Sequence, residues 1–290
     1  MNNYLFKCMQ QKLVKSRSPR SSSKFLYTLI CIFIIFCSCA CYSGCYPKHN
    51  TDFRSSQRES FVLVLVSFEG TAQKCLASER LCTTIPIPDK TWKMNIKGSG
   101  VVFTHVNGET YILTAGHVCS QDVPKKISFK KVPFALEIET KIKFYDIWGN
   151  SHEGNIIHVD HENDICLVKS PGEWARSVNI ANSMPLPGER VFNIAAPFGI
   201  YAPGMVPIFE GLYCGSDSAK NEFYSIPTKP GSSGSPVFNN NGELISLIHS
   251  SSIMLESLGL GCALENLQEI IKAYIPKPVS HQPNSSYNHY

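Results

Sequence analysis

The sequence predicts an all-β protein made of two small antiparallel β-barrels followed by a C-terminal helix. Between residues 61 and 250, short apolar runs alternate with turn residues, which is typical of antiparallel strands. Only residues 263–274 (ALENLQEIIKAY) space their apolar residues three and four apart, as an amphipathic helix does. The stretch from 61 to 275, roughly 215 residues, suits two barrels better than one sheet. We place the first barrel at about 61–175 and the second at about 185–275.

The expected strands are short, and turn residues mark their ends. They span residues 61–68, 100–106, 110–116, 141–148, 154–160, 164–170, 190–196, 205–215, 223–227, 235–239 and 243–250. Asn107-Gly108 predicts a tight hairpin turn between the second and third of these strands. Pro185–Gly188 (PLPG) should lie in or near the passage between the two barrels.

The N-terminal region predicts a membrane signal. Residues 1–24 carry six cations and no carboxylate, and residues 25–42 (FLYTLICIFIIFCSCACY) form an uncharged apolar run just long enough to cross a bilayer as a helix. The long basic head favours an uncleaved anchor with its N-terminus in the cytoplasm, which places the barrels outside the cytoplasm. The polar residues 43–60 then form a linker, and residues 276–290, with three prolines, form a flexible tail.

Two other fates of this region stay open. The apolar run could be a secretory signal that is cleaved, which would leave a secreted or periplasmic protein. Bacterial lipoprotein processing is the other, because a small residue precedes each of Cys39, Cys41 and Cys45.

Charge and metal-ligand patterns exclude two classes of function. Without the six N-terminal cations the chain has 21 Lys and Arg against 23 Asp and Glu, a net charge of −2. A nucleic-acid-binding module needs a basic face to neutralise phosphates, so we expect no nucleic-acid partner. Only His158 and His161 approach metal-ligand spacing, so we expect no zinc site.

An extracytoplasmic location permits disulfides. Cys75 and Cys82 bracket a short polar loop that a disulfide between them could close. Cys166 and Cys262 lie inside apolar stretches (DICLV and GLGCAL), which predicts buried free thiols.

Three polar segments at strand ends carry the candidate chemistry. In TAGHVC, His117 directly follows an apolar strand, from which its ring can project into a cleft. Asp164 begins the buried run DICLV, where shielding from water suits a carboxylate that holds a histidine in one tautomer. We prefer it to Asp160 and Glu162 because the residues after it form the continuous apolar strand.

The third segment is PGSSGSP, residues 230–236. Its glycines allow backbone angles closed to other residues, so the turn can aim the amide N–H groups of Gly231 and Ser233 at one point. That is the geometry needed to hold a developing oxyanion. Each segment alone could be structural, but the three together, in the order His, Asp, Ser, are far more specific.

In that order the segments resemble the motifs of the trypsin-like (chymotrypsin-fold) serine peptidases. TAGH resembles the family's histidine motif, DICLV its aspartate motif and GSSGSP its GxSGxP nucleophile motif. The similarity covers roughly residues 60–275 and is nearest to the high-temperature-requirement and glutamyl endopeptidase branches.

This resemblance implies two six-stranded barrels with the active site between them. It implies that Ser233 is the nucleophile, that His117 is the general base and then the acid, and that Asp164 orients His117. The amides of Gly231 and Ser233 would form the oxyanion hole, the substrate would be a protein or peptide, and no cofactor would be needed. Digestive members have an aspartate before the nucleophile that binds a new N-terminus. Ser232 stands there, so we expect activity without activation cleavage.

The resemblance also suggests a specificity pocket. In glutamyl endopeptidases and glutamine-specific viral proteases, a threonine and a histidine at about the positions of Thr228 and His249 bind the side chain before the cut. This favours Glu or Gln there, although Ile248 could face the pocket instead and make it apolar. Pro227, not an aspartate, stands at the pocket base, which argues against cleavage after Arg or Lys.

Two alternatives to a general endopeptidase remain. One is a catalytically silent binding module on the same fold. The other is a protease that processes its own chain or a viral polyprotein.

Overall fold

The computed structural model describes residues 56–75, 82–84, 92–121, 126–129, 132–252 and 257–276. The predicted basic head and apolar run, most of the predicted linker and nearly all of the predicted tail lie outside these ranges. Among the helices within these ranges, none is long and apolar enough to cross a bilayer. The anchor at residues 25–42 therefore stays a prediction.

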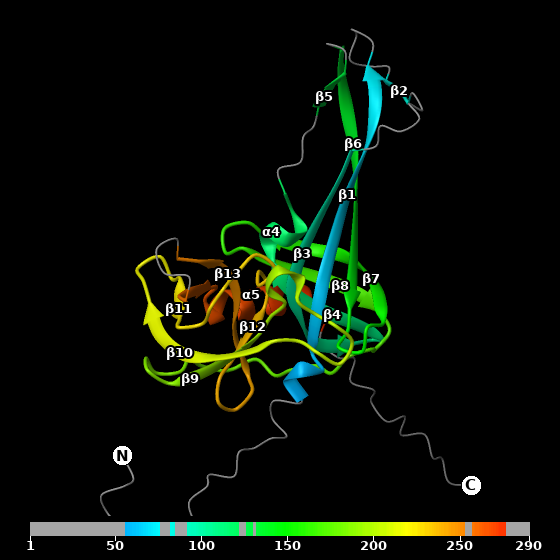
Figure 1. The fold of residues 1–290 in the computed structure, drawn as a ribbon. Coiled ribbons are helices and arrows are strands. Elements are labelled where there is room, and N and C mark those ends of the chain that lie inside the picture. The colour runs from blue at the N-terminus through cyan, green and yellow to red at the C-terminus, as the bar shows by residue number, and fades with distance from the viewer. Residues whose placement is uncertain are drawn as a thin grey trace, which may run out of the picture. The chain divides into compact units, whose positions relative to one another are not determined.

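The first barrel is a closed ring of six antiparallel strands. Around the ring they are β1 (Phe61–Cys75), β3 (Trp92–Val106), β4 (Glu109–Ala115), β8 (Ile165–Pro171), β7 (Ser151–Asp160) and β6 (Val132–Tyr145). The ring closes because β1 pairs with both β3 and β6, so that Val64 lies between Gly98 and Phe144. Figure 1 shows the outer ends of β1 and β6 continuing past the barrel, flanked by the short strands β2 (Cys82–Thr84) and β5 (Lys126–Phe129).

The second barrel is also a closed ring of six strands. Its order is β9 (Arg190–Ile194), β10 (Ile208–Ser216), β11 (Glu222–Tyr224), β14 (Gly259–Gly261), β13 (Leu244–Ser251) and β12 (Pro236–Phe238). The helix α5 (Leu264–Tyr274) follows β14 and buries Leu264, Leu267 and Ile270, which lie three residues apart on one face.

Three apolar clusters fill the barrels and the space between them. Ile112 belongs to the cluster inside the first barrel, and Tyr224 to the cluster inside the second. Leu113, the next residue along β4, belongs to a third cluster that also contains Leu247 of the second barrel. Several strands therefore bury both faces, which explains why the sequence shows continuous apolar runs there rather than strict alternation.

The fold class, all eleven predicted strands and the C-terminal helix are confirmed. Asn107 and Gly108 have left-handed φ angles of 54° and 76°, as a type I′ hairpin turn requires. The strands β2, β5 and β14 were not predicted, because they have only three or four residues each. The predicted β1, β3 and β6 were also too short, because the prediction followed continuous apolar runs and the outer ends of these strands carry charged side chains such as Glu69, Lys93 and Glu139.

Candidate active site

His117 lies in a short helical turn, α4 (Gly116–Cys119), that begins where β4 ends. Two main-chain donors hold this turn against Asp164. The N–H of Gly116 donates a hydrogen bond to the carbonyl oxygen of Asp164 at 2.9 Å, and the N–H of His117 donates one to Oδ1 of Asp164 at 2.6 Å. A Cβ at position 116 would lie only 3.0 Å from Oδ1 of Asp164, so glycine favours this close approach.

Asp164 immediately precedes β8 and has a left-handed φ of 53°, which aspartate tolerates better than most residues. Its Oδ2 accepts a hydrogen bond from Nδ1 of His117 at 2.7 Å. Burial raises the pKa of Asp164, but the hydrogen bonds and charge of His117 outweigh burial, so the pKa lies below its ordinary value. The carboxyl is therefore ionised at neutral pH. Asp160 instead accepts hydrogen bonds from the N–H groups of Glu162 and Asn163 in its own turn.

Ser233 lies in the turn before β12, and its Oγ is 2.8 Å from Nε2 of His117. Because Nδ1 of His117 donates to Asp164, Nε2 is the ring nitrogen that accepts from the Ser233 hydroxyl. The three side chains singled out in the sequence thus form one hydrogen-bonded chain from the first barrel to the second.

The nucleophile turn is fixed peptide by peptide. The carbonyl oxygen of Pro230 accepts a hydrogen bond from Phe198 N–H (2.6 Å), and that of Ser232 accepts one from Ser235 N–H (2.9 Å). Ser99 binds the other two carbonyls: its Oγ–H donates to Gly231 (2.8 Å) and its N–H donates to Ser233 (2.8 Å). The N–H of a trans peptide points away from its C=O, so these bonds also set the directions of the amide donors. Within the described part of the chain, the N–H groups of Gly231 and Ser233 have no acceptor. Both can therefore bind an oxygen atom from outside the turn.

Glycine is required at two positions of this turn. Gly231 and Gly234 have φ angles of 97° and 82°, which other residues rarely adopt. A side chain at position 231 would collide with the carbonyl oxygen of Ala196, and one at position 234 would collide with Thr114. Ser232, which lies between them, is buried.

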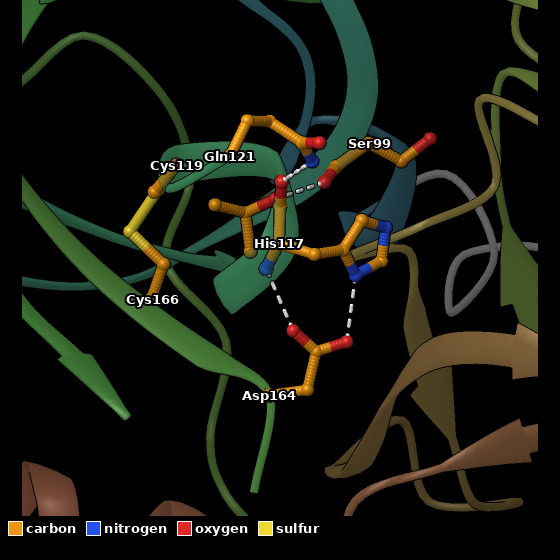
Figure 2. The surroundings of a disulfide bond; sticks show 7 residues. Ser99, His117, Cys119, Gln121, Asp164 and Cys166 are labelled. Carbon is orange, nitrogen blue, oxygen red and sulfur yellow. Dashed lines mark hydrogen bonds and ion pairs between the residues drawn. A yellow bond between two sulfur atoms is a disulfide. The ribbon is translucent and has the colours of Figure 1, made fainter. Parts of the chain in front are cut away.

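A disulfide joins Cys119 to Cys166 beside the contact between His117 and Asp164 (Figure 2). Each cysteine follows its active-site residue by two positions, and the two Cα atoms are 6.4 Å apart. The prediction that Cys166 is a free thiol is wrong. Pairing of β4 with β8 brings α4 next to β8 and so brings Cys119 next to Cys166. The local sequence around Cys166 indicates only that this residue is buried.

The remaining described cysteines agree with the sequence or leave the prediction open. Cys262 is a buried free thiol, as predicted, and Cys214 is free and exposed. The register of β1 and β2 puts Cys75 opposite Cys82, and their disulfide stays a prediction.

Removing the Cys119–Cys166 disulfide should destabilise the fold strongly. The bridge spans 47 residues. On the chain-entropy relation, its loss lowers the free energy of unfolding by about 4 kcal/mol. Urea unfolding of the Cys119→Ala/Cys166→Ala double variant measures this, with the exposed Cys214→Ala as the matched control. A double variant as stable as that control would contradict a structural role for the bridge.

A pocket of about 150 Å³ opens beside Ser233, and Thr228, Ile248 and His249 line it. Among the described residues, the buried Oγ1 of Thr228 has no hydrogen-bond partner. Burial lowers the pKa of the half-buried His249 below its ordinary value of 6.5, so its ring is neutral at neutral pH. The pocket therefore offers a hydroxyl and an imidazole beside the apolar wall of Ile248.

No metal site is evident in the described ranges, where no three His, Cys, Asp or Glu side chains gather closely enough to hold an ion. His158, one of the two histidines with suggestive spacing, stacks on Tyr274 with ring centroids 4.2 Å apart.

Comparison with known proteins gives the family. The model of the trypsin-like peptidase domain matches residues 98–247, which include His117, Asp164 and Ser233. None of the curated proteins is significantly similar in sequence.

Two solved structures illustrate the likeness in fold. A serine endoprotease from Yersinia pestis is 18% identical with a TM-score of 0.55, over 79% of this chain and 67% of that one. An inactive serine-to-alanine variant of Rv3671c from M. tuberculosis is 13% identical with a TM-score of 0.51, over 79% of this chain and 94% of that one. At these identities the likeness shows the fold alone. Because the domain match spans half of the sequence, the chain belongs to the trypsin-like peptidase domain family, a family of serine endopeptidases.

Proposed function

We propose that the protein hydrolyses peptide bonds in protein or peptide substrates through an acyl-enzyme on Ser233. The observation that carries this proposal is the hydrogen-bonded chain from Asp164 through His117 to Ser233, which ends beside two amide N–H groups with no acceptor among the residues that the structure describes. Serine is unreactive at neutral pH unless a base removes its proton as it attacks, and this chain supplies that base.

The reaction proceeds in two halves. Oγ of Ser233 attacks the substrate carbonyl carbon while its proton passes to Nε2 of His117, and ionised Asp164 stabilises the imidazolium. The oxyanion accepts hydrogen bonds from the amides of Gly231 and Ser233. Nε2–H then protonates the leaving amine as the C–N bond breaks, which leaves an ester on Ser233. In the second half, His117 deprotonates a water molecule that hydrolyses the ester and restores the serine.

We further propose that the pocket binds Glu or Gln before the cut. The buried hydroxyl of Thr228 lacks a partner in the described structure, and a carboxylate or amide oxygen in the pocket can accept its hydrogen bond. Nδ1 of His249 lies 3.0 Å from Oγ of Ser250, so a second hydrogen bond to the substrate must come from the N–H at Nε2. The apolar wall of Ile248 can pack against the methylene groups of either side chain.

A fluorophosphonate probe and a peptide library test these two proposals separately. The probe should label the wild type at Ser233, and the library should show cuts after Glu or Gln. His249→Ala should lose those substrates selectively and still react with the probe. If His249→Ala lost activity equally on all substrates, the proposed Glu/Gln pocket would be contradicted but the proposed peptidase activity would not.

The preference for Glu over Gln should increase at acidic pH. Because burial lowers the pKa of His249 below 6.5, the ring is neutral at pH 7 and gains its charge only as the pH falls further. The charged ring attracts the carboxylate of Glu, which stays ionised down to about pH 4.3, but not the neutral amide of Gln. Any pH effect on catalysis that is common to both substrates cancels in the ratio of their kcat/KM values.

The measurement is that ratio between about pH 5 and pH 8. It should rise toward acid in the wild type and stay flat in His249→Gln. A flat ratio in the wild type would remove His249 from the pocket model.

We also propose that residues 25–42 anchor the chain in a membrane with the barrels outside the cytoplasm. The support is the uncharged apolar run behind six cations. The full-length protein should then stay with the membrane in alkaline carbonate. Release with a new N-terminus after the run would favour the cleaved signal.

A further inference from the structure

Ser99 reaches the nucleophile turn from the other barrel. It lies in β3, and its side chain is fully buried. Its Oγ donates to the carbonyl oxygen of Gly231 at 2.8 Å and accepts from the N–H of Ala196 at 3.0 Å, while its own N–H donates to the carbonyl oxygen of Ser233 at 2.8 Å. One residue of the first barrel thus binds two carbonyls of the turn and one amide of the second barrel (Ser99 is labelled in Figure 2).

The position of the Gly231 carbonyl explains why this matters. It belongs to the peptide between Gly231 and Ser232, which lies between the two peptides whose N–H groups find no acceptor in the described ranges. The N–H of this central peptide donates to the carbonyl oxygen of Lys229 at 2.8 Å, and its C=O accepts from Ser99. The flanking peptides are held by main-chain donors, from Phe198 and Ser235. A substitution of Ser99 can therefore loosen the central peptide, because its C=O is held by a side chain and not by a main-chain donor.

Resting on the proposed function, we propose that Ser99 is a positioning residue that aims the amides of Gly231 and Ser233 at the oxyanion. Without its hydroxyl, the buried N–H of Ala196 and the C=O of Gly231 lose their shared partner. Since an unsatisfied buried polar group is costly, the central peptide turns toward another partner and carries the neighbouring amides with it. The tetrahedral oxyanion depends on these amides far more than the ground-state carbonyl does, so the loss falls on kcat rather than KM.

Ser170 supplies a matched control. Its side chain is also buried, its Oγ donates to the carbonyl oxygen of Glu153 at 2.6 Å, and it accepts from Nε1–H of Trp174 at 3.1 Å. Ser170→Ala thus removes the same kind of hydroxyl with one donated and one accepted bond, but near the end of β8 away from Asp164. A merely structural effect would be the same in both variants.

The experiment compares Ser99→Ala and Ser170→Ala in the full chain, normalised to folded protein by near-UV circular dichroism. Ser99→Ala should lower kcat by about tenfold or more, somewhat less than deletion of an oxyanion donor, with KM nearly unchanged. A peptide boronic acid, whose adduct places an oxygen in the oxyanion hole, should bind more weakly by the same factor. Ser170→Ala should leave kcat and boronate affinity at the wild-type level.

Each outcome decides the inference. Equal kcat values in the two variants, or a Ser99→Ala loss confined to KM, would overturn the positioning role. If Ser99→Ala does not fold, Ser99→Cys, which keeps the size but has a weaker donor and acceptor, takes its place with the same expected pattern. A wild type that neither labels with fluorophosphonate nor cleaves peptides would overturn the proposed function itself, and this inference with it.

Discussion

Replacing Ser233 by alanine should lower kcat by about a million-fold and leave KM nearly unchanged. The Oγ atom 2.8 Å from Nε2 of His117 is the attacking atom, so without it only a water molecule can attack the carbonyl carbon. The pocket and the amide donors stay in place, so a residual rate of about a thousand-fold over the uncatalysed reaction should persist. Hydrolysis of a fluorogenic peptide with Glu before the cut, at high enzyme concentration, measures both the loss in kcat and the residual rate.

His117→Ala is the matched control for this experiment. Because the base and the nucleophile act as one unit, its loss should equal that of Ser233→Ala, and the double variant should be no worse. Additive losses, or a Ser233→Ala variant that keeps a tenth of the activity, would contradict the proposed mechanism. If the chain is instead a silent binding module, the wild type and Ser233→Ala will be equally inert.

The features that could be predicted from the sequence are those that a short local residue pattern determines. The candidate residues His117, Asp164 and Ser233 each stand at the end of an apolar strand, within a short motif whose neighbours already fit a tight turn. The Asn107-Gly108 hairpin was equally local. Strand ends were harder, because the outer residues of β1, β3 and β6 gain strand structure from pairing with one another and not from their own composition.

What the sequence could not predict depends on contacts between distant segments. Cys119 and Cys166 each look like buried residues of their own strand or turn, and only the pairing of β4 with β8 makes them neighbours. One signal was present: each follows its candidate active-site residue by two positions, so bringing His117 to Asp164 brings the cysteines together as well. Ser99 carried no such signal, because its partner Gly231 is 132 positions away in the chain.

Replacing Asp164 by asparagine should lower kcat by about ten-thousand-fold while the fold stays intact. The main-chain N–H of His117 donates to Oδ1 at 2.6 Å, so the asparagine must keep its oxygen at that position. Its NH₂ group then faces Nδ1 of His117, where Oδ2 accepts a hydrogen bond at 2.7 Å in the native protein. Nδ1 must become the acceptor, and the ring proton moves to Nε2. With a proton on Nε2, His117 cannot take one from Ser233.

Asparagine isolates this proton switch from structural damage. Position 164 has a φ of 53°, which asparagine tolerates about as well as aspartate, whereas Asp164→Ala would add backbone strain and leave the His117 N–H without its acceptor. Urea unfolding should therefore separate the two variants, and nitrogen NMR of the His117 ring should find the proton on Nε2 only in Asp164→Asn. An Asp164→Asn enzyme within tenfold of the wild-type kcat would mean that Asp164 does not set the tautomer of His117, and the role of the chain from Asp164 to Ser233 would have to be reconsidered.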